Sequence, residues 1–199
     1  MASSRTLLEF TRVEAGYRSS VVGPLSLRVD AGEVVGLAGP NGCGKSTLLG
    51  LLTGQTRRFG GTLHAPRSIA FLHQTPPEGS ELPLRGDELL ALLHADPSVL
   101  PEALRGAAGQ RVDRLSGGQR QSLHLWAVLG NAAPLVVLDE PTNNLDAQGR
   151  ELLVQALLHA EPERGFLVVS HDAEFVARVC HRVLRLLPDG CPDEGMEPA

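Results

Sequence analysis

The feature that most constrains the fold is a glycine-rich segment between a buried-strand pattern and a helix pattern. It reads Gly39-Pro40-Asn41-Gly42-Cys43-Gly44-Lys45-Ser46 and fits G-x-x-x-x-G-K-S/T in full. Residues 34–38 before it are continuously apolar, as expected of a strand covered on both faces, and residues 46–52 after it read as a helix. The other interpretation is a chance glycine-rich turn. The strand–loop–helix order predicts an α/β fold.

Such a segment is suited to holding phosphates. Its glycines let successive backbone N–H groups turn inward at the positive end of a helix. The Lys45 ammonium is expected to reach the β- and γ-phosphates of ATP, and the Ser46 hydroxyl to ligate Mg²⁺. Lys45 is the only lysine among 18 basic residues. A compact ammonium fits among phosphate oxygens where a planar guanidinium would crowd the loop. Residues 39–46, together with Thr47, are therefore the predicted nucleotide-binding loop.

A second apolar run is followed by two acidic residues. Residues 135–138 read as a buried strand and lead directly into Asp139 and Glu140. Parallel α/β sheets place their ligands at the carboxyl ends of strands. We expect Asp139 to hold the metal through its water shell and Glu140 to polarise the water that attacks the γ-phosphate.

A third motif is the segment Leu115-Ser116-Gly117-Gly118-Gln119. A serine and two glycines at the start of a helix form a second anion cradle, for which one chain offers no further phosphate. With this motif, the chain resembles the ATP-binding cassette (ABC) ATPases over nearly its whole length. The resemblance implies a head-to-tail dimer. Each ATP would lie between residues 39–46 of one subunit and Ser116–Gln119 of the other.

The resemblance also assigns roles to scattered residues. Gln74 looks like the glutamine that touches Mg²⁺ and the attacking water. The loop Asn144-Leu145-Asp146 is similar to the one that crosses the dimer interface, with Asp146 near the nucleotide. His171 resembles the histidine that contacts the γ-phosphate, and Tyr17 sits where the family stacks an aromatic ring on adenine. Taken alone, each of these residues could equally be a structural polar or turn residue.

The chain departs from the family pattern in the helix that follows Gln119. The family often has Gln-Arg-Gln-Arg and, further on, Ala-Arg-Ala. Ser122 stands where the second of these arginines is usual, and Leu125-Trp126-Ala127 replaces Ala-Arg-Ala, so Trp126, the only tryptophan, takes the place of the other arginine. One interpretation is a repacked helix face with Trp126 in the core. The other is an altered contact between this helix and the nucleotide core, which would change the ATPase rate.

The expected architecture is a single domain over residues 1–199. It has a P-loop NTPase (RecA-like) core with a mostly parallel sheet, N-terminal antiparallel β elements and a small inserted α-helical subdomain. Residues 1–74 and 131–187 are assigned to the nucleotide-binding core, 75–130 to the helical subdomain and 188–199 to a flexible tail. In the N-terminal part we expect strands over residues 7–13, 25–29, 62–64 and 69–73.

The composition limits the kinds of molecule to which the protein is expected to bind. The net charge of −5 argues against direct nucleic-acid binding. We find no signal peptide and no apolar run of about 18 residues, so a cytoplasmic protein is expected. The first hypothesis is the ATPase subunit of a transporter, held at the inner face of the membrane by a transmembrane permease and paired with a second ABC subunit. Residues 61–74 most resemble metal-ion importers.

Two alternatives have less support. Residues 141–146 and 169–175 resemble soluble, translation-associated cassette proteins, but those usually carry two cassettes, a charged linker and RNA-binding ability. A chromosome-maintenance ATPase would need long coiled-coil arms, and the sequence has no heptad run.

Overall fold

The computed structural model describes residues 5–73, 84–193 and 197–198. Its N-terminal part is an antiparallel sheet in the order β2-β1-β4. These strands are β1 (Thr6–Gly16), β2 (Ser20–Asp30) and β4 (Arg57–His64). β1 alternates between buried and exposed residues over most of its length, as expected of a strand with one face on the core. The sheet therefore has one face available to cover another layer.

The second sheet has the order β5-β6-β7-β3-β8-β9. Its strands are β3 (Val34–Ala38), β5 (Ile69–Leu72), β6 (Leu135–Asp139), β7 (Gly165–Val169), β8 (Arg182–Arg185) and β9 (Glu197–Pro198). The ladders are parallel except the last, in which β9 runs antiparallel to β8. The central strands β3, β6 and β7 are almost entirely buried, because both faces of the sheet are covered. The expected mostly parallel sheet is confirmed.

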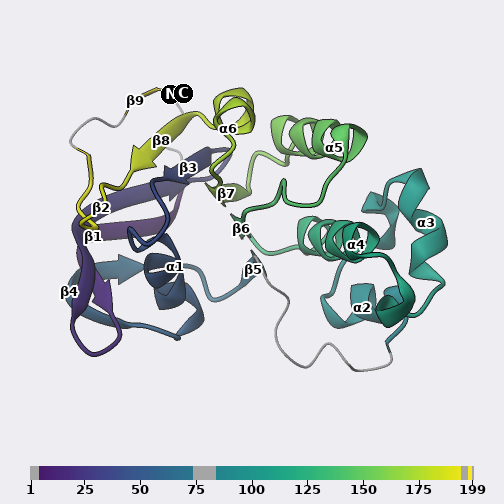
Figure 1. The fold of residues 1–199 in the computed structure, drawn as a ribbon, viewed down its shortest axis with the longest axis horizontal. Helices are drawn as coiled ribbons and strands as arrows, with labels where there is room; N and C mark the ends of the chain where they lie inside the picture. The colour runs from purple at the N-terminus through teal and green to yellow at the C-terminus, as the bar shows by residue number, and fades with distance from the viewer. Residues whose placement is uncertain (1–4, 74–83, 194–196, 199) are drawn as a thin grey trace.

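The helices connect these strands (Figure 1). They are α1 (Lys45–Thr53), α2 (Gly86–Leu92), α3 (Glu102–Ala108), α4 (Gly117–Leu129), α5 (Ala147–Leu158) and α6 (Ala173–Val179), with short 3₁₀ turns at Pro97–Val99 and Val112–Arg114. Helices α2 to α4 gather at one end of the molecule, between β5 and β6 in the chain (Figure 1). The proposed boundaries of a helical subdomain stay a prediction.

Two hydrophobic clusters lie on opposite faces of the parallel sheet. One joins α1 and the antiparallel sheet to side chains such as Val35, Leu37 and Val137. The other joins α2 to α6 to the alternate side chains, Val136 and Phe166 among them. The period-two alternation of side chains along each buried strand produces this division. The sheet thus forms a middle layer, and its strand ends carry the loops of the candidate site.

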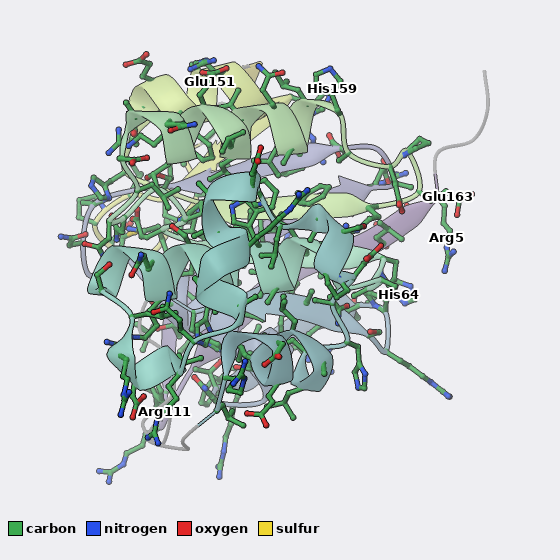
Figure 2. The ribbon with its side chains drawn as sticks, turned by 90° about the vertical axis from the view of Figure 1, so that its right-hand side faces the viewer. Arg5, His64, Arg111, Glu151, His159 and Glu163 are labelled. Carbon is green, nitrogen blue, oxygen red and sulfur yellow. The ribbon has the colours of Figure 1, made fainter. Side chains whose placement is uncertain are left out.

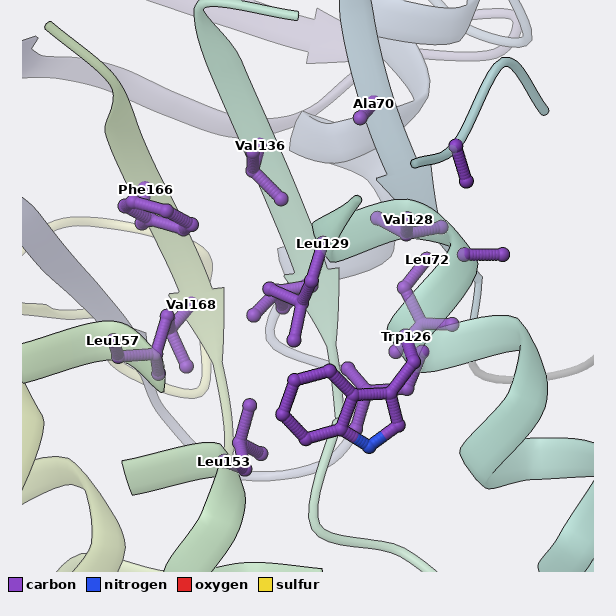
Figure 3. Close-up of a cluster of buried hydrophobic side chains, with 14 of the residues drawn as sticks. Ala70, Leu72, Trp126, Val128, Leu129, Val136, Leu153, Leu157, Phe166 and Val168 are labelled. Carbon is purple, nitrogen blue, oxygen red and sulfur yellow. The ribbon is translucent and has the colours of Figure 1, made fainter. Parts of the chain in front are cut away.

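Trp126 belongs to the second cluster and is 9% exposed. Figure 3 shows its indole in the same buried cluster as Leu129 and Leu153. The interpretation of Trp126 as a core residue is confirmed. By contrast, Figure 2 shows Arg111, Glu151 and Glu163 directed away from the body of the molecule.

Several elements differ from expectation. β1 extends to Gly16 and β2 begins at Ser20, so the turn between the two strands is shorter than predicted. The short strand expected at 62–64 begins at Arg57, because residues 57–60 pair with the end of β1 although their sequence does not alternate. Residues 188–193, expected as part of a flexible tail, belong to a hydrogen-bonded hairpin. Within the described residues, no helix is long and apolar enough to cross a bilayer.

Candidate functional site

The glycine-rich loop joins β3 to α1 at the carboxyl edge of the parallel sheet. Gly42 and Gly44 have φ values of 83° and 101°, which only glycine adopts without strain. Gly44 is the N-cap of α1, and no side chain caps that helix. The tip of the loop is exposed, whereas Cys43 and Gly44 at its base are buried. The first N–H groups of α1 therefore lie at a surface loop, where an anion can satisfy them.

Lys45 curls back over this loop. Its Nζ donates to the carbonyl of Gly39 at 2.8 Å and to that of Pro40 at 2.9 Å, and it lies 4.0 Å from the Cys43 sulfur. The ammonium is thus held at the loop by weakly basic oxygens. Phosphate oxygens are stronger partners for an ammonium than carbonyls are. Ser46 is exposed and Thr47 is buried in the first turn of α1, and their nucleotide contacts stay predictions.

Asp139 ends β6, next to β7 in the same sheet. Burial and, to a smaller extent, the neighbouring Glu140 carboxylate raise the pKa of Asp139 to about 6, although the Lys45 charge opposes both effects. A half-buried carboxyl next to a second one suits a divalent cation, since such an ion favours the ionised form. The residues present therefore fit Mg²⁺ held by Asp139 and Ser46 with phosphate oxygens. Gln74, the third predicted ligand, lies outside the described residues.

Glu140 and His171 are in direct contact. Glu140 is 7% exposed and has a φ of 51°. Its Oε2 lies 2.8 Å from His171 Nδ1 and accepts a longer bond, 3.4 Å, from the His171 backbone N–H. The two residues follow paired strands, since Asp139 lies opposite Val169. The structure brings together the predicted water-polarising carboxylate and the predicted phosphate-contacting histidine. The sequence analysis missed this contact, because it requires knowing that β6 and β7 are neighbours.

The Leu115–Gln119 motif forms the start of α4. Ser116 Oγ accepts from the Gln119 N–H at 3.2 Å, and Gln119 Oε1 accepts from the Ser116 N–H at 3.1 Å. This reciprocal pair is a capping box. Both side chains and Gly117 are exposed, and Gly118 lies against the carbonyl of Asn144, which would be 3.2 Å from an added Cβ. The motif is therefore a surface helix start, as predicted.

The site residues fall into two separate groups. Gly39, Pro40 and His171 border a cavity of about 500 Å³, whose other lining residues lie mostly in α6, in β8 and just after β8. A second cavity of about 320 Å³ is lined by Ser116, Gly118, Gln119, Asn144 and Asp146. Of the described residues that line this second cavity, none comes from the 39–46 loop. Within the part of the chain that the structure describes, the predicted phosphate-binding loop and the Ser116–Gln119 motif thus lie in separate places.

The remaining predicted residues are placed as follows. Tyr17 lies in the turn between β1 and β2 and is 58% exposed, so its ring is free to stack. Asp146 is the N-cap of α5, and its Oδ1 accepts from the Gly149 N–H at 2.7 Å. Ser122 and Trp126 line the second cavity. Their effect on turnover stays a prediction.

Comparisons of the sequence with a family model and with known proteins point to the same family. Residues 22–143 match the family model described as ABC transporter. The hemin import ATP-binding protein HmuV of Pseudomonas fluorescens is 35% identical over 88% of this chain and 80% of its own length. The ABC transporter F family member 5 of Arabidopsis thaliana is 28% identical over 96% of this chain, which spans only 29% of that relative.

A solved structure described as the ATP binding subunit of an ABC transporter has the same fold. It superposes with a TM-score of 0.85 at 25% identity and covers 96% of this chain and 90% of its own. The agreement extends over the antiparallel sheet, the parallel sheet and the helices between them, because almost the whole chain is covered.

Proposed function

The chain belongs to the ABC transporter ATP-binding family, and on that premise we propose that it drives a separate membrane permease by ATP-induced head-to-tail dimerisation. It is an ATPase of the ABC type. The observation that supports the dimer is the separation of the predicted site residues, since the cavity beside Ser116, Gln119 and Asp146 is lined by no described residue of the 39–46 loop. Each half is complete only when a second subunit supplies the other.

Residues 39–47 would hold the phosphates of ATP, with Lys45 exchanging its loop carbonyls for phosphate oxygens. Ser46, Asp139 and Gln74 would hold Mg²⁺, which would neutralise negative charge on the phosphate oxygens of ATP. Tyr17 would stack on the adenine ring.

Glu140 would accept hydrogen bonds from the attacking water and align it with the γ-phosphate. Its carboxylate is already positioned, because the His171 ring and backbone hold one oxygen. Because Oε2 is fixed by His171, the orientation of the second carboxylate oxygen, Oε1, is fixed as well. His171 is well exposed on its other side, so Nε2 can reach the γ-phosphate while Nδ1 faces Glu140.

The partner subunit would close the site with Ser116–Gln119, and Asp146 would lie at the same interface. A permease would hold the assembly at the inner face of the membrane. Metal-ion import is a finer proposal that rests on the resemblance of residues 61–74. The relative named for hemin import has a different cargo in its name.

The second candidate is a soluble, translation-associated cassette protein. The Arabidopsis F-family relative supports it through its match to 96% of this chain. That relative is more than three times as long as the matched part, and the net charge of −5 disfavours RNA. We therefore favour the transporter subunit.

Replacement of Glu140 tests the dimer. Glu140→Gln keeps the shape of the side chain and removes the charge that polarises water, so ATP should bind and a stable ATP-bound dimer should accumulate in size-exclusion chromatography. A variant that stays monomeric at saturating ATP refutes the mechanism. Lys45→Ala, which should not bind ATP, is the matched monomeric control.

Co-purification from native cells tests the partner. The tagged protein is solubilised in mild detergent and its partners are identified by mass spectrometry. A multi-span membrane protein is the expected partner, whereas ribosomal proteins and rRNA would favour the second candidate.

A further inference from the structure

The hairpin after β8 packs against the base of the glycine-rich loop. Leu186 donates its N–H to the carbonyl of Ala38, at the end of β3, at 2.8 Å. A Cβ added at Gly39 would meet the carbonyl oxygen of Leu186 at 2.7 Å. The first glycine of the loop therefore rests directly on the chain at Leu186.

The other end of the loop rests on the same hairpin. Gly190 is buried and has a φ of 82°. A Cβ added there would lie 2.6 Å from the carbonyl oxygen of Val21 and 3.4 Å from that of Cys43. The Gly190 carbonyl also accepts from the Gly23 N–H at 3.0 Å. A side chain at Gly190 would thus have to displace β2 at Val21, and it would come into contact with the loop base at Cys43.

The hairpin is itself closed by local hydrogen bonds. Leu187 donates to the carbonyl of Cys191 at 2.8 Å, and Gly190 donates to that of Leu187 at 3.0 Å. The Asp189 carboxylate accepts from the Cys191 N–H at 3.0 Å. These bonds hold Gly190 in the left-handed conformation that fits beneath the loop.

We propose that the hairpin Leu186–Cys191 is a positioning element for the phosphate-binding loop. The inference rests on the proposed role of residues 39–46. The three glycines with positive φ in this loop, Gly39, Gly42 and Gly44, give its backbone high conformational freedom. A flexible loop loses conformational entropy when it becomes ordered around phosphate, and this loss weakens ATP binding. Support at Gly39 and Cys43 removes much of that freedom in advance. The hairpin raises ATP affinity without touching ATP.

The test compares two glycines in the left-handed region. Gly190→Ala adds a methyl group that collides with backbone, whereas Gly54→Ala at the end of α1 has a φ of 73° and no atom within 4 Å of the added Cβ. Both pay the cost of a left-handed alanine. Only Gly190→Ala should weaken ATP binding to the full-length protein, by about tenfold, which equals about 1.4 kcal/mol.

Three further readouts separate positioning from general destabilisation. Gly190→Ala should raise the KM for ATP and leave kcat within about twofold, because saturating ATP restores the loop. Hydrogen exchange at Cys43 to Lys45 should be faster in Gly190→Ala than in Gly54→Ala. Asp189→Ala, which adds no atom, should weaken ATP binding about two- to threefold through the lost hydrogen bond, and it decides the matter should Gly190→Ala not fold.

Equal ATP affinity in the two glycine variants overturns the proposal, whether both are weakened or neither is. Lys45→Ala serves as the reference for the proposed function. Loss of ATP binding in Lys45→Ala together with wild-type binding in Gly190→Ala and Asp189→Ala would refute the hairpin's role alone. Undiminished ATP binding in Lys45→Ala would instead refute the assignment of phosphates to residues 39–46.

Discussion

Ser116 caps α4 and, in the proposed dimer, also binds the partner's nucleotide; substitution can separate these two roles. Its Oγ accepts the Gln119 N–H at 3.2 Å and so caps α4. A hydroxyl has one proton to donate as well as lone pairs to accept, so Oγ can donate to a partner-bound γ-phosphate while it caps the helix. Alanine does neither. Aspartate accepts the same backbone N–H but has no proton to give.

The expected stabilities follow from the cap. Ser116→Ala loses an N-cap, which costs about 1 kcal/mol and lowers the melting temperature by about 2–4 °C in a domain of this size. Ser116→Asp keeps the cap and places a negative charge at the positive end of α4, so its stability should stay within about 0.5 kcal/mol of the wild type. The two variants should therefore differ clearly in thermal unfolding.

The expected ATPase activities of the two variants do not follow their expected stabilities. Loss of one hydrogen-bond donor to a transition-state oxygen costs about 100-fold or more in turnover. Ser116→Ala should lose that much, and Ser116→Asp should lose at least as much, because its carboxylate repels the γ-phosphate. Nucleotide affinity of the monomer should be unchanged in both variants, since in the proposed dimer Ser116 faces the partner's ATP.

The assays are steady-state ATP turnover, thermal unfolding and titration of the monomer with a fluorescent nucleotide. Asp96→Ala is the matched control. Asp96 caps the 3₁₀ turn Pro97–Val99 by accepting the Ser98 N–H at 2.8 Å and lines neither half-site. Its loss should reduce stability and spare turnover. Turnover of Ser116→Asp within about threefold of the wild type would show that Ser116 acts through the cap alone.

Two further predictions concern the core. Burial raises the pKa of Cys180 to about 12, so an aromatic disulfide reagent at pH 8 should label the more accessible Cys191 first and reach Cys180 only after unfolding; early labelling of Cys180 would contradict its burial. Trp126→Ala should lower the free energy of unfolding in urea by about 3–5 kcal/mol, with Trp126→Phe much milder; equal losses in the two would mean that the indole volume is not what the core requires.

Features set by adjacent residues could be predicted from the sequence. The loop at residues 39–46 lies between a buried strand and a helix, and both its glycines and Lys45 act within that local unit. The cap at Ser116 is equally local, since Gln119 is three residues away. The strand that ends at Asp139 could be recognised by its continuous apolar run.

Contacts between segments that are distant in the chain could not be predicted from the sequence. The pairing of Glu140 with His171 depends on β6 and β7 being neighbours, which the order of strands along the chain does not reveal. The hairpin around Gly190 has a proline, glycine and acidic composition that is typical of a loose tail. Its order comes from Gly23 and the loop base at Cys43, more than 140 residues earlier in the chain.

The two helix starts agree with the proposed dimer, in which one chain is half of the enzyme. At α1 the N-cap is Gly44, which has no side chain, so the backbone N–H groups are available to an anion as soon as it arrives. At α4 the capping box of Ser116 and Gln119 already satisfies one N–H group. The first site is therefore suited to bind ATP alone. The second contributes mainly the Ser116 hydroxyl and the positive helix end, which count only where a γ-phosphate is already held by another subunit.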